Sequence, residues 1–234
     1  MASAHADSEH DEHGHGEHPS YLAHHFDTPD QQFDAAKLGM WVFIVTEILM
    51  FGGLFVAYLI YKSQEPAVFI EAHQRLDWKL GSVNTIVLLF SSLTAALAVR
   101  SSQLGKKNET TMWLTITILC AFAFLGIKYV EYSHKFHDGL LPGRYFTAHL
   151  PEHAHHGAVL PQRASMFFAL YFMMTGLHGL HVIIGMSVLG WVLLRNQRGE
   201  FSSEYFTPVE IGALYWHLVD LVWIYLFPLV YLVG

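Results

Sequence analysis

The chain has 234 residues, of which 53% are hydrophobic and 14% are charged, and its formal net charge at pH 7 is −7. So apolar a composition excludes an ordinary soluble domain. The excess negative charge lies in the first 36 residues, so the net charge does not point to a nucleic-acid partner, and we expect none.

Residues 1–36 form a polar segment that contains eight acidic residues, seven of the 17 histidines and no lysine or arginine. This composition cannot bury a core and predicts a disordered His-rich tail. A mixture of His, Asp and Glu can hold zinc, copper or nickel weakly, but a solvated tail is the favoured interpretation. Neither a basic residue nor an apolar run precedes residue 37, which argues against a cleaved secretory signal.

Residues 37–234 contain five mostly apolar stretches, at roughly 38–61, 80–100, 111–132, 164–194 and 209–233. About 20 such residues cross the hydrocarbon core of a bilayer as a helix. The connections are short except for 134–161, "HKFHDGLLPGRYFTAHLPEHAHHGAVLP", whose six histidines show no fixed ligand spacing. Because short connections make neighbouring helices antiparallel, we predict an all-α membrane protein, a compact bundle of five transmembrane helices.

The basic residues give a prediction of orientation. The densest basic clusters are "LGKKN" after the second stretch and "RNQR" after the fourth, and both fall on the side of the N-terminus. The positive-inside rule gives such short loops the most weight, so it favours a cytoplasmic N-terminus and a C-terminus outside.

The first apolar stretch contains one acidic residue, Glu47, near its middle and far from any basic residue in the sequence. A charged side chain costs about 2.5–3.5 kcal/mol at the centre of a bilayer on insertion scales, so such residues are usually functional or paired. Glu47 is therefore interpreted in two ways that stay open. It belongs to a proton-linked or lipid-linked site, or it is a protonated acid that hydrogen-bonds to a neighbouring helix.

The third stretch ends in "GIKYVEYSHK", in which Lys128, Glu131 and Lys135 follow one another at about one helical turn. Residues three and four apart face each other on a helix. A local ladder of ion pairs explains these three charges, and this interpretation is favoured over a functional one.

The last stretch carries Glu210, His217 and Asp220, whose spacing predicts one polar stripe that faces other protein. The fourth stretch places His178 and His181 three residues apart in "TGLHGLHVIIG". These histidines could hold a metal or haem together with His217. However, Gly176, Gly179 and Gly185 lie beside them, and small residues indicate close helix contact, so hydrogen bonding to a helix or a lipid headgroup is favoured.

Five segments of the chain together resemble a known family. The segments "TGLHGLHVIIG" and "YWHLVDLVWIYLF" resemble the two most characteristic parts of subunit III of cytochrome c oxidase, a haem-copper oxygen reductase. The segments "GMWVFIVTEILMFGGLF", "NTIVLLFSSLTAALA" and "GIKYVEYSHK" are similar to its earlier helices. The similarity covers about residues 36–234 and is closest to the five-helix bacterial form, whereas the loop at 133–162 is longer and richer in histidine than the family pattern.

The resemblance implies an accessory subunit in the bacterial cytoplasmic (inner) membrane that carries no cofactor itself. It implies haem a and copper on partner subunits, cytochrome c as electron donor to the complex, subunit I as the main contact, and subunit II and small subunits nearby. Bound phospholipids, support of proton uptake and durability of the enzyme are also expected. It assigns proton- or lipid-linked intramembrane positions, but no catalytic or metal role, to the residues Glu47, Glu131, His178, His181, His217 and Asp220.

Three alternatives stay open beside this interpretation. An accessory subunit of a nitric oxide reductase system can have a C-terminal segment much like "VDLVWIYLFPLVYL". A quinol oxidase subunit III ranks behind it, because the resemblance implies aspartate there in place of the glutamate of "TEILMF". A self-contained transporter or metal-binding membrane protein would use the polar stripes and the His-rich tail.

Overall fold

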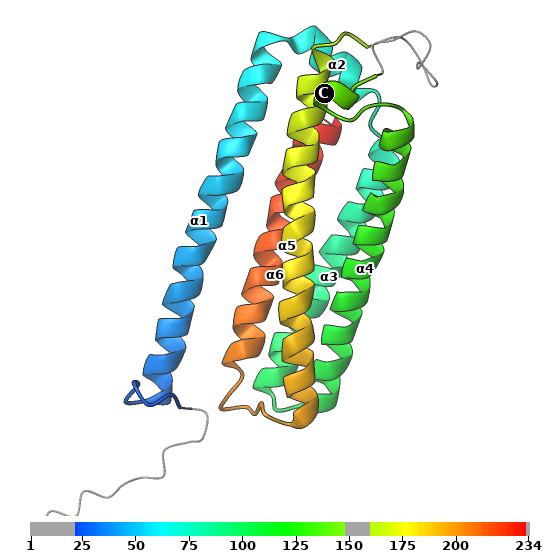
Figure 1. The fold of residues 1–234 in the computed structure, drawn as a ribbon. Coiled ribbons are helices and arrows are strands. Elements are labelled where there is room, and N and C mark those ends of the chain that lie inside the picture. The colour runs from blue at the N-terminus through cyan, green and yellow to red at the C-terminus, as the bar shows by residue number, and fades with distance from the viewer. Residues whose placement is uncertain (1–21, 148–159, 233–234) are drawn as a thin grey trace, which may run out of the picture.

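The computed structural model describes residues 22–147 and 160–232, so most of the His-rich tail and much of the loop at 133–162 lie outside the described residues. The described chain is helical and has five helices long and apolar enough to cross a membrane (Figure 1). The prediction of an all-α protein with five spans is confirmed. Its elements are α1 (Pro29–Gln64), α2 (Pro66–His73), α3 (Trp78–Gln103), α4 (Lys107–His137), η1 (Gly143–Tyr145), α5 (Ala164–Arg198), α6 (Thr207–Phe227) and the π-helical turn η3 (Pro228–Leu232).

The helix ends follow local chemistry that the hydropathy pattern does not show. Helix α1 begins inside the segment expected to be tail, because the Thr28 hydroxyl accepts the Gln31 N–H at 3.2 Å and Pro29 occupies the first turn. Asp77 caps α3 by accepting the N–H of Lys79 at 2.9 Å. The last span changes from α- to π-helix at Pro228, which has no N–H for the regular ladder.

The short helix α2 was not predicted from the sequence, which indicated only a connection between the first and second spans. Pro66 at its first position starts it, and Phe69 and Ala72 bury its inner side. The end of the bundle that carries α2 is called the α2 end below. There α1, α4 and α6 finish and α3 and α5 begin.

Helices α3, α4, α5 and α6 form a four-helix group in which neighbours along the chain are antiparallel, as the short connections predicted (Figure 1). Buried positions in α3 recur every three or four residues, at Gly81, Asn84, Leu88, Ser91, Ala95 and Ala98. This heptad-like spacing is typical of helices that pack at small crossing angles.

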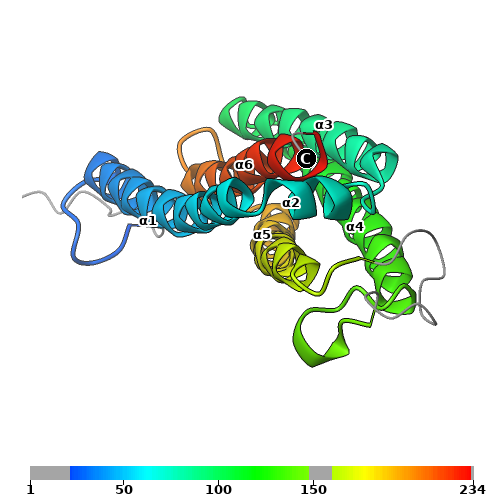
Figure 2. The same cartoon turned by 90° about the horizontal axis from the view of Figure 1, so that it is seen from above.

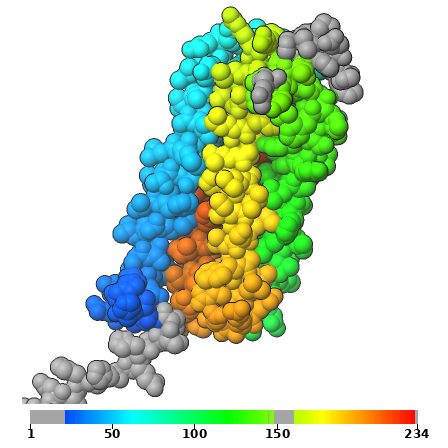
Figure 3. All heavy atoms as spheres, in the orientation of Figure 1, coloured from blue at the N-terminus to red at the C-terminus, as the bar shows by residue number. Residues whose placement is uncertain are grey.

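Helix α1 packs against α6, α5 and α2 and reaches out from the four-helix group (Figure 2). In its most apolar window only 17% of the residues are buried, against 56% in the last span. Figure 3 shows orange atoms of α6 between α1, in blue, and α5, in yellow. Helix α6 is thus the centre of the molecule, and α1 is its most exposed spanning helix.

Candidate functional site

Glu47 and His181 meet where α1, α5 and α6 come together. Glu47 Oε2 lies 3.0 Å from His181 Nε2, and the two side chains are 14% and 11% exposed. The distance is that of an ion pair, although the atoms are not aligned as in a good hydrogen bond. The Phe51 ring stands edge-on to His181, and the Tyr215 hydroxyl donates to the His181 carbonyl at 3.2 Å, so all three helices hold the histidine.

The backbone decides which nitrogen of His181 carries a proton. His181 Nδ1 lies 2.8 Å from the Leu177 carbonyl oxygen, which can only accept, so Nδ1 is the donor. Nε2 is therefore the nitrogen that faces the Glu47 carboxyl, at 3.0 Å. A carboxyl group and an imidazole at this distance are placed so that a proton can pass between them.

His178 belongs to different surroundings, although it is three residues from His181. Its ring is fully buried and lies 5.4 Å from the Phe124 ring and 5.2 Å from the Trp223 ring. Neither of its ring nitrogens has a hydrogen-bond partner among the described residues. The two histidines therefore do not form one site.

The three glycines near these histidines also have different surroundings. A Cβ atom on Gly185 would lie 2.9 Å from the Trp216 ring, so this glycine permits close packing of α5 on α6. A Cβ atom on Gly179 would meet nothing within 4 Å, and one on Gly176 only the Tyr132 hydroxyl at 3.9 Å. The expectation of close helix contact is therefore right for Gly185 and wrong for Gly176 and Gly179, which line a groove between α4 and α5.

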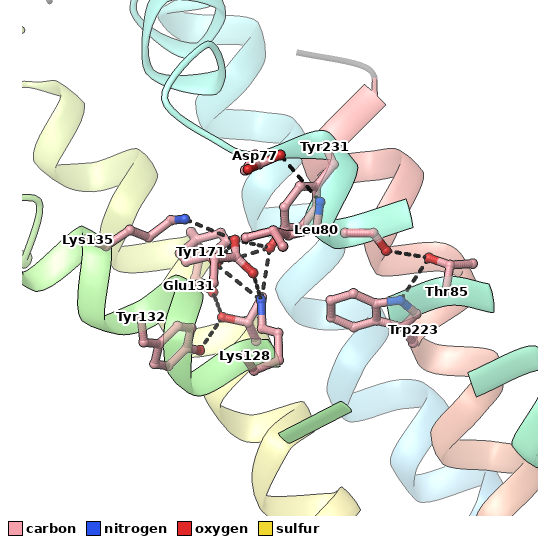
Figure 4. A network of polar contacts seen from close by, with 12 residues as sticks. Asp77, Leu80, Thr85, Lys128, Glu131, Tyr132, Lys135, Tyr171, Trp223 and Tyr231 are labelled. Atoms are coloured by element: carbon pink, nitrogen blue, oxygen red, sulfur yellow. Dashed lines mark hydrogen bonds and ion pairs between the residues drawn. The ribbon is translucent and has the colours of Figure 1, made fainter. Parts of the chain in front are cut away.

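Glu131 is the centre of a buried cluster of charges and hydroxyl groups (Figure 4). Lys128 Nζ donates to one of its carboxylate oxygens at 2.8 Å, and Lys135 Nζ donates to the other at 2.9 Å. The Tyr171 and Tyr231 hydroxyls also donate to Glu131, at 2.8 and 2.6 Å. The predicted ladder of ion pairs is confirmed, and these five residues are called the Glu131 cluster.

The Glu131 cluster links three parts of the chain. Lys128 Nζ also lies 2.9 Å from the Tyr231 hydroxyl and 3.2 Å from the Tyr171 hydroxyl, so its three donors all have acceptors. Tyr171 comes from α5 and Tyr231 from η3. Neither tyrosine was predicted from the sequence, because no local spacing indicates residues that lie 40 and 100 residues from Glu131.

The polar residues of the last span contact several different elements. Glu210 pairs with Lys37 of α1 at 3.0 Å, and His217 Nδ1 lies 2.8 Å from the Ser92 hydroxyl of α3. Asp220 is 2% exposed, and neither of its carboxyl oxygens makes a well-formed hydrogen bond to a described residue. The residues of the stripe face protein, as expected. Glu210 contacts α1, whereas His217 and Asp220 both lie beside Ser92 of α3.

These contacts bear on metal binding. Within residues 22–147 and 160–232 no three His, Cys, Asp or Glu side chains gather as a metal-ligand group. His178, His181 and His217, the three candidate ligands, face aromatic rings, a carboxyl group and a hydroxyl group respectively.

Comparison with known proteins identifies relatives along nearly the whole chain. Residues 19–234 match the family model described as cytochrome c oxidase subunit III. A cytochrome c oxidase subunit 3 of Synechocystis is 33% identical over 94% of this chain and 79% of the relative. A quinol oxidase subunit 3 of Bacillus subtilis is 29% identical over 84% and 86%, and a probable quinol oxidase subunit 3 of Staphylococcus aureus is 27% identical over 89% and 94%.

Proposed function

The chain belongs to the cytochrome c oxidase subunit III family, and we propose that it is the accessory, cofactor-free subunit III of a proton-pumping cytochrome c oxidase. The family match makes it a multi-pass subunit III of a haem-copper terminal oxidase, which partners subunits I and II of the complex. The finer assignment has cytochrome c as the donor and haem a and copper on the other subunits.

The observation that carries this proposal is the match along residues 19–234, supported by the Synechocystis relative, whose alignment covers 94% of the chain. Glu47 in "TEILMF" agrees with the pattern that the resemblance implies for cytochrome c oxidases. The chain would pack mainly on subunit I in a bacterial cytoplasmic membrane, with its N-terminus in the cytoplasm.

The Glu47 and His181 pair supports a role in proton uptake and lipid binding rather than in electron transfer. A shared proton inside the membrane lets the pair hydrogen-bond to a lipid or to water without a net charge. The same pair joins the exposed helix α1 to α5, so it also supports the durability of the assembled enzyme.

Quinol oxidase is the second candidate, because relatives with that name occur in Bacillus and Staphylococcus. A tag on this chain, used to purify the native complex, separates the two. We expect haem a and copper to co-purify and the complex to oxidise reduced cytochrome c. Oxidation of quinol but not of cytochrome c would favour the second candidate, and a chain that purifies without any oxidase subunit would overturn both.

A further inference from the structure

We propose that the hollow between α1 and α5 at the α2 end binds the headgroup of a phospholipid that carries a primary ammonium group, such as phosphatidylethanolamine. The hollow has a volume of about 730 Å³ and is called the α1–α5 hollow. The proposal rests on the proposed function, since it gives one of the lipids expected of this subunit a place and a headgroup.

The α1–α5 hollow lies at the depth of a lipid headgroup. Its charged residues stand at helix ends, Glu65 directly after α1 and Arg163 directly before α5. Helices that span a membrane end near the boundary between hydrocarbon and water. Met166 and Ala169, one and two turns further into α5, add an apolar wall on the membrane side. A ligand that fits has a polar part at the boundary and apolar chains below it.

Arg163 and Glu65 form an ion pair across the mouth of the α1–α5 hollow. Their side chains are 75% and 41% exposed, so a ligand in the hollow can reach both. A guanidinium group presents five N–H donors in a fork that matches two oxygens of a phosphate. The carboxylate accepts hydrogen bonds and favours a cation. The amides of Gln64 and Gln162 add neutral donors and acceptors around the pair.

The pair is neutral as a whole, and this selects among headgroups. A phosphoethanolamine group brings one phosphate for Arg163 and one ammonium for Glu65, so each charge gains a partner. A phosphatidylglycerol headgroup has no cation and would place its phosphate beside the Glu65 carboxylate. A choline headgroup has a cation without an N–H and cannot donate to that carboxylate. Partly exposed ion pairs are weak, so we expect a preference for ethanolamine of about two- to fivefold.

The experiment uses the complete purified oxidase that contains this chain. The complex is depleted of lipid and titrated with deuterated phosphatidylethanolamine, phosphatidylcholine or phosphatidylglycerol, and the retained lipids are counted by native mass spectrometry. For the wild-type complex we expect the number of tightly held lipids to be greater by one with phosphatidylethanolamine than with phosphatidylcholine or phosphatidylglycerol. Glu65→Gln should remove the preference for ethanolamine over choline, and Arg163→Lys, which keeps a cation beside Glu65, should weaken retention of all three.

Glu210→Gln is the matched control, because it makes the same charge change and breaks an ion pair of α1 at the opposite end of the helix. It should leave the lipid preference unchanged. An unchanged preference in Glu65→Gln would overturn the proposal. If the Glu65→Gln complex no longer contains the subunit, the Arg163→Lys variant tests the proposal. Unchanged lipid retention in Arg163→Lys would then overturn the proposal. Wild-type protein that is absent from any oxidase would instead refute the proposed function.

Discussion

Glu131 shows how much of a buried site local sequence can predict. Its ion pairs with Lys128 and Lys135 follow from spacings of three and four residues on one helix, so the sequence alone indicated them. Its burial and its two tyrosine donors depend on how α5 and η3 pack against α4. Long-range packing of this kind has no signature in a local pattern.

We predict that Glu131→Gln destabilises the protein strongly. Removing one partner from a buried ion pair leaves an uncompensated charge and typically costs about 3–5 kcal/mol, and here two lysines lose their carboxylate. The free energy of unfolding of the purified chain in mixed micelles, measured by titration with SDS, gives the effect.

Glu109→Gln is the control, because Glu109 pairs with Lys106 at the same i,i+3 spacing, but both side chains are about half exposed. Its expected cost is below about 1 kcal/mol. Equal costs for the two variants would show that the Glu131 cluster is not desolvated in the membrane.

Glu47 gives a second prediction. Glu47→Gln keeps a hydrogen-bonding group opposite His181 and should keep the subunit in the complex with unchanged haem and copper. Glu47→Ala removes the 3.0 Å polar contact between α1 and α5, and we expect its loss to cost up to about 1 kcal/mol. The alanine variant should therefore lose activity about two- to fivefold sooner during sustained turnover, with little change in its initial rate.

Oxygen uptake of both variants over many turnovers is the measurement. If Glu47→Ala abolished the initial rate while all subunits and haems were present, Glu47 would belong to the catalytic machinery and its supporting role would be wrong.

His178 and His181 show the limit of an argument from helical spacing. A step of three residues turns the helix by about 300°, so the two rings differ by about 60° in direction. That difference is small in a helical diagram, but it is enough to aim one ring at α4 and α6 and the other at α1. The His181 ring hydrogen-bonds to the Leu177 carbonyl of its own helix and lies 3.0 Å from Glu47 of α1, whereas His178 lies among aromatic rings without a hydrogen-bond partner in the described part of the chain.

The five spanning helices were predictable because each needs about 20 apolar residues, and few other features of a sequence look like that. Their ends were less predictable, because caps such as Thr28 and Asp77 act over three residues and lie outside the apolar runs. The eight-residue helix α2 is too short for a hydropathy signal. The neighbours of each helix also depend on side-chain size, most clearly at Gly185.

We predict that Gly185→Ala weakens the packing of α5 on α6 and Gly179→Ala does not. The added methyl group at position 185 would press on Trp216, and such overpacking typically costs about 1–3 kcal/mol. At position 179 the methyl group meets open space, so the change should be neutral or slightly stabilising. Both effects are measured by heating the purified oxidase and recording the temperature at which this subunit is lost from the complex. A larger effect at Gly179 would contradict the packing described for α5.

The whole molecule consists of a well-packed four-helix group and one attached helix. Pairs of ionisable side chains join α1 to the rest of the molecule at three depths, with Lys37 and Glu210 at one end, Glu47 and His181 in the middle, and Glu65 and Arg163 at the α2 end. Because so little of α1 is buried, these pairs and the surrounding lipid or protein contribute much of what holds it in place. Charges at these positions are therefore explained by attachment of α1 as well as by any role in proton uptake.

The same architecture predicts what happens when the subunit is removed from its complex. The three intramembrane histidines face three different surroundings, so this chain offers no common site at which they could hold a haem together. Detergent extraction of the subunit should leave haem and copper per catalytic subunit unchanged, and it should shorten the active lifetime because the proposed lipid and proton-uptake contacts would be lost. Optical spectra and metal analysis of the stripped complex test the cofactor content, and oxygen uptake over many turnovers tests the active lifetime.

The isolated chain should show no Soret absorption. A stoichiometric haem bound to the isolated chain and lost in His178→Ala would contradict this, because His178 would then be an axial ligand and the packing of Phe124 and Trp223 around it could not be that of the native subunit.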